Sequence, residues 1–355
     1  MNSSYIASLL GGLPALPTPA APPLNLLLKE LNRRPRSRSE WQARFSHWQR
    51  PASDTEEAKI DAVARRISVA LRRSEFLPSR QWRVVKQGSY HNNTNVRNDS
   101  DMDLGVCLAD AFFVDGPQND FPSMAELRRE PVPFQFDQYK SHIAWCLEQE
   151  FGRGTVRIGK KAISIHKDDH EKIDADIVPA YTFQIFGPRV GLGGSRSTRH
   201  NGIALVTTEG QRITNFPDQH YVNGCAKNER TGRRYKRVTR ILKRLRNHMA
   251  ENSEVPEKVR FRAKNTPSFL IESLVYNCPD HLFGNSEIYD DVVAVLRHLN
   301  AGLNDRSDGG TLLTLPIWAF WYEVNGIKSL FGGGQAWSLF EASSFIEYAR
   351  GYMEL

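Results

Sequence analysis

The sequence predicts an α+β protein of two lobes, and three observations lead to that prediction. Its 355 residues exceed the size that one hydrophobic core usually serves. Short strands alternate with helices in the first part of the chain, whereas helical periodicity dominates the second part. We therefore expect a loosely ordered arm over residues 1–37, a sheet-containing lobe with N-terminal helices over 38–202, and a helical lobe over 203–355.

The arm and the first helices have clear local signals. Residues 13–23 are rich in proline and alanine, which disfavours regular structure, and a helix is expected over 39–49. Ser53 and Glu56 have the spacing of a capping box, so a longer helix should begin there and run to about residue 74. Its apolar residues recur at helical spacing and predict a buried stripe of Ile60, Val63, Ile67 and Leu71.

The remaining elements follow from the same two periodicities. Strands are expected around 82–86 and 101–108, followed by a helix over 137–150 and by further strands around 155–158, 162–166 and 173–179. Residues 187–202 are dense in glycine, serine and arginine and predict a loop at the boundary between the lobes. Helices are expected beyond it over 217–227, 233–249, 267–276, 287–303 and 336–352.

Composition excludes several classes of protein. No apolar run approaches the length of a membrane span, and the N-terminal residues lack the basic segment of a secretory signal, so we expect a cytoplasmic protein. The four cysteines are widely scattered without a metal-binding spacing and read as reduced thiols. The net charge of +7 suggests a polyanionic partner, either a nucleic acid or nucleoside triphosphates gathered in a basic cleft.

The candidate chemistry begins at Gln87, Gly88 and Ser89. A glycine turn that opens a helix lets backbone N–H groups and a hydroxyl approach phosphate oxygens closely. Asp101 and Asp103 follow on one face of the next strand, about 6 to 7 Å apart. Such a pair can bridge two divalent cations for phosphoryl transfer, which requires hard oxygen ligands.

A two-metal site calls for a third carboxylate. The strand near 173–179 offers Asp174 and Asp176, which project from the same face because side chains two apart on a strand point the same way. Spacing alone allows either aspartate to complete the shell of one metal and to help deprotonate an attacking hydroxyl.

These motifs together resemble the DNA polymerase β-type nucleotidyltransferase superfamily. Further sequence motifs resemble those of its cGAS/DncV-like branch, which is found in bacterial CBASS anti-phage systems. They are Gln-Gly-Ser-Tyr at 87–90, Thr-Asn-Val-Arg at 94–97, Asn-Phe-Pro-Asp-Gln-His-Tyr at 215–221, Ile-Leu-Lys at 241–243 and Pro-Ser-Phe-Leu-Ile-Glu at 267–272. The resemblance covers residues 53–350 approximately. It implies a polymerase β-like lobe with a mixed sheet, followed by a helical nucleotide-binding lobe.

The resemblance also implies roles for individual residues. Asp101, Asp103 and Asp176 would bind two Mg²⁺ ions, with Mn²⁺ as an alternative, and Asp176 is preferred because it directly precedes an apolar pair and Pro-Ala. Gln87, Gly88 and Ser89 would hold the donor triphosphate. In the helical lobe, Lys243 and Ser268 would contact phosphates and Phe269 would stack on the donor base.

Three of these assignments also have ordinary structural explanations. Lys243 belongs to an amphipathic segment whose cations could form a solvated face. Ser268 could cap the helix that begins near Pro267, and Phe269 could be a core residue.

The resemblance implies synthesis of a cyclic di- or oligonucleotide second messenger from nucleoside triphosphates, ATP among them, with release of pyrophosphate. A separate effector protein would read the product in anti-phage defence, without a membrane partner. One alternative is transfer of a nucleotide to an RNA end, a small molecule or a protein. An alternative of another class is a nucleic-acid-binding module, suggested by the basic run over 230–246, although it leaves the aspartates unexplained.

Overall fold

The computed structural model describes residues 33–51, 54–74, 77, 81–96, 102–115, 136–166, 174–186, 198–307 and 315–355. The chain divides into two compact units, Met1–Arg34 and Pro35–Leu355, and the second is considered below. Most of the predicted arm lies outside the described residues, as do the side chains of the predicted capping box, Ser53 and Glu56.

One mixed sheet is built from seven strands of the described residues, in the order β1-β2-β5-β4-β3, with β6 beside β5 and β7 beside β6. The strands are β1 (Trp82–Gln87), β2 (Met102–Asp115), β3 (Val156–Ile158), β4 (Ile163–Ile165), β5 (Ala175–Phe186), β6 (Thr198–Val206) and β7 (Arg212–Asn215). Strands β2 and β5 run parallel, and the other neighbours are antiparallel. The predicted α+β class with a mixed sheet is confirmed.

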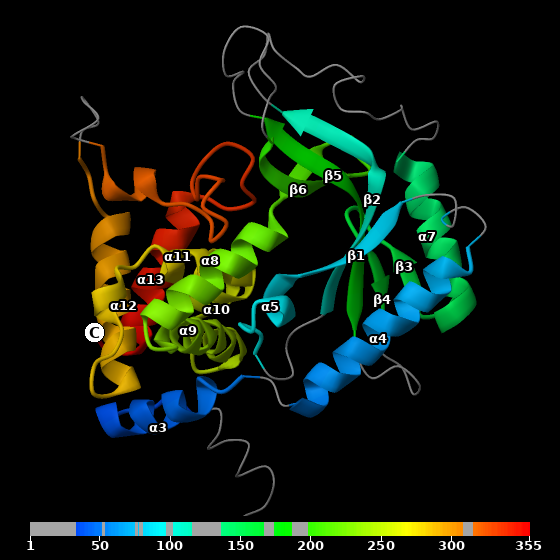
Figure 1. Ribbon diagram of the computed structural model, residues 1–355. Coiled ribbons are helices and arrows are strands. Elements are labelled where there is room, and N and C mark those ends of the chain that lie inside the picture. The colour runs from blue at the N-terminus through cyan, green and yellow to red at the C-terminus, as the bar shows by residue number, and fades with distance from the viewer. Residues whose placement is uncertain are drawn as a thin grey trace, which may run out of the picture. The chain divides into compact units, whose positions relative to one another are not determined.

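Strand β2 has one apolar face and one face that carries Asp103. Met102, Leu104 and Val106 are buried in a core shared with α4 (Asp54–Arg72) and α7 (Phe136–Phe151), which lie on the same side of the sheet (Figure 1). Because side chains alternate along a strand, Asp103 points to the other face. Burial of the apolar face thereby fixes the orientation of the carboxylate.

The sheet extends further along the chain than the sequence indicated. The loop expected over 187–202 is corrected in its last part, because β6 already begins at Thr198 and pairs with β5. The close approach of β7 explains the glycine at position 202, because a Cβ there would lie 2.5 Å from the carbonyl oxygen of Asn215. Pairing with β5 and β7, and not local propensity, therefore makes this segment a strand.

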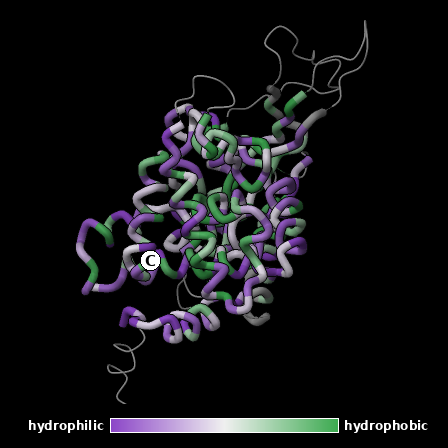
Figure 2. The backbone as a smooth tube through the Cα atoms, turned by 90° about the vertical axis from the view of Figure 1, so that its left-hand side faces the viewer, coloured by the Kyte–Doolittle hydropathy of each residue, from purple (hydrophilic) through white to green (hydrophobic). Residues whose placement is uncertain are grey.

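Helices make up the rest of the described chain. They include α8 (Pro217–Arg230), α9 (Arg234–Glu251), α10 (Glu257–Asn265), α11 (Ser268–Tyr276), α12 (Ile288–Leu303) and α13 (Leu339–Tyr352). All but α10 were predicted. Hydrophobic and hydrophilic residues alternate along these helices, as expected where one face is buried (Figure 2). None of the described helices is both long enough and apolar enough to span a membrane.

Helix α3 (Arg38–Trp48) packs in the core of these helices, although the sequence grouped it with the sheet. Its N-cap is Ser37, whose side chain accepts a hydrogen bond from the backbone N–H of Glu40. Trp41, Phe45 and Trp48 are buried and point into the helical core. The four cysteines are free thiols, as predicted.

Replacing Phe45 by alanine is expected to lower the free energy of unfolding by about 3 to 5 kcal/mol, because the ring is fully buried and would leave a cavity. Urea denaturation followed by circular dichroism measures this change. Phe261→Ala is the matched control, since that ring is 61% exposed and its loss should change stability by about 0.5 kcal/mol or less. Equal effects of the two variants would contradict the packing of α3 in the helical core.

Candidate active site

The turn at Gly88 brings its backbone close to the carboxylate of Asp103. Gly88 follows β1, begins the short helix α5 (Gly88–His91) and has a φ of +72°, which favours glycine. A Cβ at this position would lie 1.8 Å from Oδ2 of Asp103. Only glycine therefore lets the start of α5, including Ser89, approach the carboxylate of Asp103.

The strand register aligns four polar side chains in a row across the sheet. Gln87 on β1 is paired with Asp103 on β2, Asp103 with Asp176 on β5, and Asp176 with Ser164 on β4. Directly paired residues project from the same face of a sheet. The two aspartates, seventy-odd positions apart in the sequence, are consequently neighbours on the face opposite α4 and α7.

The two candidate third acids differ in their surroundings. Asp176 accepts a hydrogen bond of 2.6 Å from the hydroxyl of Ser164, which orients its carboxylate. Asp174 precedes β5, and its Oδ1 lies 3.7 Å from Nδ1 of His166. Only Asp176 lines the cavity described below.

Asp101, the first predicted metal ligand, lies outside the described residues. Within the described ranges, no three or more His, Cys, Asp or Glu side chains come together in an arrangement that could hold a metal. Among the described residues, Asp103 and Asp176 are paired across neighbouring strands and supply carboxylates, which are the hard oxygen ligands that Mg²⁺ prefers. The chemistry of this pair fits a divalent ion.

A cavity of about 820 Å³ opens over three members of this row, Gln87, Asp103 and Asp176. Its volume falls in the range that proteins use for ligands of nucleotide size. Strand residues and helix residues both line it: Gln87, Gly88, Ser89, Asp103, Lys161 and Asp176 from the sheet side, and His220, Lys243, Ser268, Phe269, Glu272, Gln335 and Trp337 from the helical side. Every predicted site residue other than Asp101 therefore lines one cavity.

Lys243 is buried in an ion pair and does not belong to a solvated face. Its Nζ lies 2.8 Å from Oε2 of Glu272 and 3.0 and 3.2 Å from Oγ1 and the carbonyl oxygen of Thr94. Burial lowers the pKa of Lys243, although the carboxylate of Glu272 opposes this shift. Burial alone would raise the pKa of Glu272, but Lys243 and His220 hold it well below its usual range. Glu272 is therefore an anion in the folded protein.

Ser268 and Phe269 begin α11, where the N-cap is Pro267. The helix start has no side-chain cap, so Ser268 does not play the capping role considered for it. Its hydroxyl accepts a hydrogen bond of 2.8 Å from Arg246. The ring of Phe269 is partly exposed to the cavity, with its centroid 5.8 Å from that of Trp337.

The sequence interpretation missed several residues of the helical wall. Glu272 belongs to the sequence motif at 267–272, but no role was predicted for it. Its position three residues after Phe269 on a helix was the available signal. Trp337, Gln335 and Glu323 come from the segment before α13, which has no periodicity to reveal it. Gln335 donates a hydrogen bond of 2.8 Å to Glu323, whose side chain is buried.

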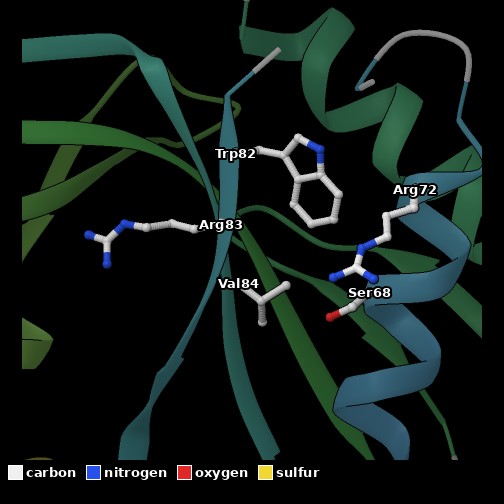
Figure 3. Close-up of a pocket in the computed structure, with 5 residues that line it drawn as sticks. All are labelled: Ser68, Arg72, Trp82, Arg83 and Val84. Carbon is white, nitrogen blue, oxygen red and sulfur yellow. The ribbon is translucent and has the colours of Figure 1, made fainter. Parts of the chain in front are cut away.

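A second, smaller cavity of about 420 Å³ lies between α4 and β1, lined by Ser68, Arg72, Trp82, Arg83 and Val84. Trp82 and Val84 face Arg72 and Ser68 across it, while Arg83 points to the other side of the strand (Figure 3). It has no carboxylate in its lining. The carboxylates of Asp103 and Asp176 line the larger cavity, which is therefore the candidate site.

The known proteins to which this chain is similar include a nucleotidyltransferase family and several cyclic nucleotide synthases. Residues 222–354 match the family model of the cGAS/DncV-like nucleotidyltransferase C-terminal helical domain. A cyclic dipyrimidine nucleotide synthase, CdnE, of Legionella pneumophila is 35% identical over 320 residues, which cover 89% of this chain and 98% of that protein. A cyclic dipurine nucleotide synthase of Elizabethkingia meningoseptica is 32% identical over 67% of this chain and 76% of its own length.

Solved structures extend the similarity to the fold. The Rhodothermus marinus CdnE c-UMP-AMP synthase with Apcpp and Upnpp has a TM-score of 0.70 and 25% identity, and the match covers 90% of this chain and 97% of that one. The Elizabethkingia meningoseptica CdnE cyclic dinucleotide synthase with GTP and Apcpp has a TM-score of 0.67, 25% identity and coverages of 88% and 99%. Because the Legionella pneumophila relative is 35% identical over 89% of this chain and 98% of its own length, the chain belongs to the cGAS/DncV-like nucleotidyltransferase family of enzymes.

Proposed function

We propose that this enzyme joins nucleoside triphosphates into a cyclic dinucleotide or oligonucleotide and releases pyrophosphate at each transfer. The observation that carries the proposal is the register of Asp103 and Asp176, side by side next to the Gly88 turn at the base of one large cavity. Its relatives support the cyclic product, since their names describe cyclic dipyrimidine, dipurine and UMP-AMP synthases.

The proposed metal ligands are Asp101, Asp103 and Asp176, which would hold two Mg²⁺ ions, or Mn²⁺ in their place. Bound metal ions would stabilise the negative charge that develops on the phosphates. Asp176, oriented by Ser164, would accept the proton of the ribose hydroxyl as that oxygen attacks the α-phosphorus and pyrophosphate leaves. A second transfer, from the 5′-triphosphate of the linear intermediate to its free hydroxyl, would close the ring.

The proposed triphosphate contacts are the Gly88 backbone and the side chains of Gln87, Ser89, Lys243 and Ser268. The three N–H donors of Lys243 make hydrogen bonds to Glu272 and Thr94. To contact a phosphate, Lys243 must therefore give up one of these hydrogen bonds. The longest, 3.2 Å to the carbonyl oxygen of Thr94, is the natural one to exchange.

Phe269 is proposed to stack on the donor base. Its ring reaches the cavity next to Trp337, and aromatic faces bind any nucleobase through stacking worth about 1 to 3 kcal/mol. We further propose that the product acts in anti-phage signalling and is read by a separate effector protein.

Incubation of the purified protein with all four nucleoside triphosphates and Mg²⁺ is expected to yield pyrophosphate and a cyclic oligonucleotide. Treatment with phosphatase followed by mass spectrometry identifies the product, since a ring has no terminal phosphate to remove. All four substrates are needed because the relatives differ in the bases that they join. The Asp103→Asn variant is the negative control.

A linear product from protein that is active in pyrophosphate release would contradict cyclisation. Labelled nucleotide recovered on added tRNA, or on the protein itself, would favour transfer to another acceptor. The metal site would stand in either case, and only the proposed product would change.

A further inference from the structure

The carboxylate of Glu272 receives hydrogen bonds from three separate segments of the chain. Its Oε2 lies 2.7 Å from the hydroxyl of Thr94 and 2.8 Å from Nζ of Lys243 on α9. Its Oε1 lies 2.8 Å from Nε2 of His220 on α8. Glu272 is only 3% exposed, so these contacts are made in a region with little water to screen them.

Thr94 connects the carboxylate of Glu272 to the Gly88–Ser89 turn, which is proposed to bind the triphosphate. The backbone N–H of Thr94 donates a hydrogen bond of 2.9 Å to the carbonyl oxygen of Ser89. The preceding residue, Asn93, accepts a hydrogen bond through its carbonyl oxygen from Arg240 on α9. The segment that follows Ser89 is therefore held on the helices, and within its described part, residues 90–96, the side chain of Thr94 contacts Glu272.

Glu272 also lies close to Phe269, the residue proposed to stack on the donor base. Phe269 lies three residues earlier on α11, which places both side chains on adjacent positions of one helix face. The ring of Phe269 is centred 5.4 Å from that of His220, the third partner of Glu272. One buried side chain thus joins a residue proposed to bind the base with a turn proposed to bind the triphosphate.

We propose that Glu272 is a positioning residue, which sets the Gly88–Ser89 turn relative to Phe269 by holding Thr94 together with Lys243 and His220. This inference rests on the function proposed above, because it assigns the two ends of the cavity to the phosphates and the base. Glu272 acts through its partners and needs no contact with the substrate. Displacing reacting groups by about 1 Å can cost about a hundredfold in rate, so such positioning has a measurable effect.

Thr94→Val tests the link because valine has the shape of threonine without the hydroxyl. We expect kcat to fall by about tenfold or more, since a hydrogen bond to a charged group is lost, with a smaller change in KM. Thr94→Ser keeps the hydroxyl and should restore most of kcat. A purely structural role for Thr94 would instead lower the melting temperature of both variants and leave the kcat and KM of the folded fraction unchanged.

Hydrogen–deuterium exchange supplies a readout that does not depend on activity. In Thr94→Val, amides over residues 88–96 should exchange about tenfold faster than in the wild type, while those of β5 stay unchanged. Loss of activity without faster exchange in this segment would overturn the inference, and so would Thr94→Val with wild-type kcat.

Glu272→Gln tests the carboxylate itself and should produce the same local increase in exchange. Combined with Thr94→Val, it should reduce kcat no further than the worse single variant, because both changes break one link. Glu272→Gln leaves Lys243 as an unpaired buried cation, and the variant can therefore fail to fold. In that case hydrogen–deuterium exchange is measured on the double variant Glu272→Gln with Lys243→Met, in which both charges are removed. Multiplied effects of the two single variants on kcat would contradict a shared link.

These experiments separate the two proposals. A wild-type protein that transfers no nucleotide would refute the proposed function, whereas the coupling between Glu272 and residues 88–96 would still be visible by exchange. A fully active wild type in which Thr94→Val changes neither exchange nor kcat would refute the positioning role alone.

Discussion

Asp103→Asn is expected to reduce nucleotidyl transfer by at least about a thousandfold while the protein stays folded. Asparagine has the shape of aspartate, so the contact with Gly88 persists, but the negative charge needed to bind a divalent ion is lost. Metal stabilisation of phosphoryl transfer is worth several kcal/mol, and each 1.36 kcal/mol corresponds to about a tenfold change in rate. Pyrophosphate release under saturating Mg²⁺ measures the loss.

Asp176→Asn should be impaired to a similar extent, because Asp176 is the direct partner of Asp103 across the parallel strands. Asp174→Asn is the matched control: it makes the same chemical change two residues away, at a carboxylate directed towards His166. It should retain activity within about threefold of the wild type, an effect below 1 kcal/mol. An Asp174→Asn variant as inactive as Asp176→Asn would exchange the roles proposed for these two residues.

Gly88→Ala is expected to lower kcat/KM by about a hundredfold or more and to destabilise the fold by about 2 kcal/mol or more. The added Cβ would overlap Oδ2 of Asp103 at 1.8 Å, and the φ of +72° adds strain. Relief of the overlap must move either the turn that carries Ser89 or the carboxylate itself. Steady-state kinetics and thermal denaturation measure the two effects.

Gly152→Ala separates strain from overlap. Gly152 also has a positive φ, +91°, but a Cβ there would have nothing within 4 Å. This variant should lose about 1 kcal/mol of stability from strain and retain its catalytic rate. Equal kinetic losses in the two variants would show that backbone strain, and not the approach to Asp103, explains the effect at Gly88.

Local sequence patterns determined much of the sheet face and its chemistry. Apolar residues at alternate positions of β2 require one buried face, so Asp103 had to project from the other. Gly88 likewise has a positive φ, a backbone conformation that glycine tolerates better than other residues. Period and residue type are local properties, and for that reason they could be read without coordinates.

Register was decided only by the tertiary structure. Asp174 and Asp176 share a strand face and are equivalent by spacing, but the pairing of β5 with β2 sets Asp176 opposite Asp103. The strand β6 was hidden for the same reason, because its conformation depends on hydrogen bonds to β5 and not on its own composition. Contacts between residues distant in sequence leave no periodic signal.

The charges of α9 show the same division. By itself, the sequence determined an amphipathic basic helix with Lys243 on it, and it determined the α+β class, the apolar faces and the candidate carboxylates. Only the tertiary structure decided that Lys243 is buried against Glu272 and Thr94, two residues from other segments. Burial of a charge is unfavourable unless a partner compensates for it, and that partner is supplied by the fold and not by the neighbouring sequence.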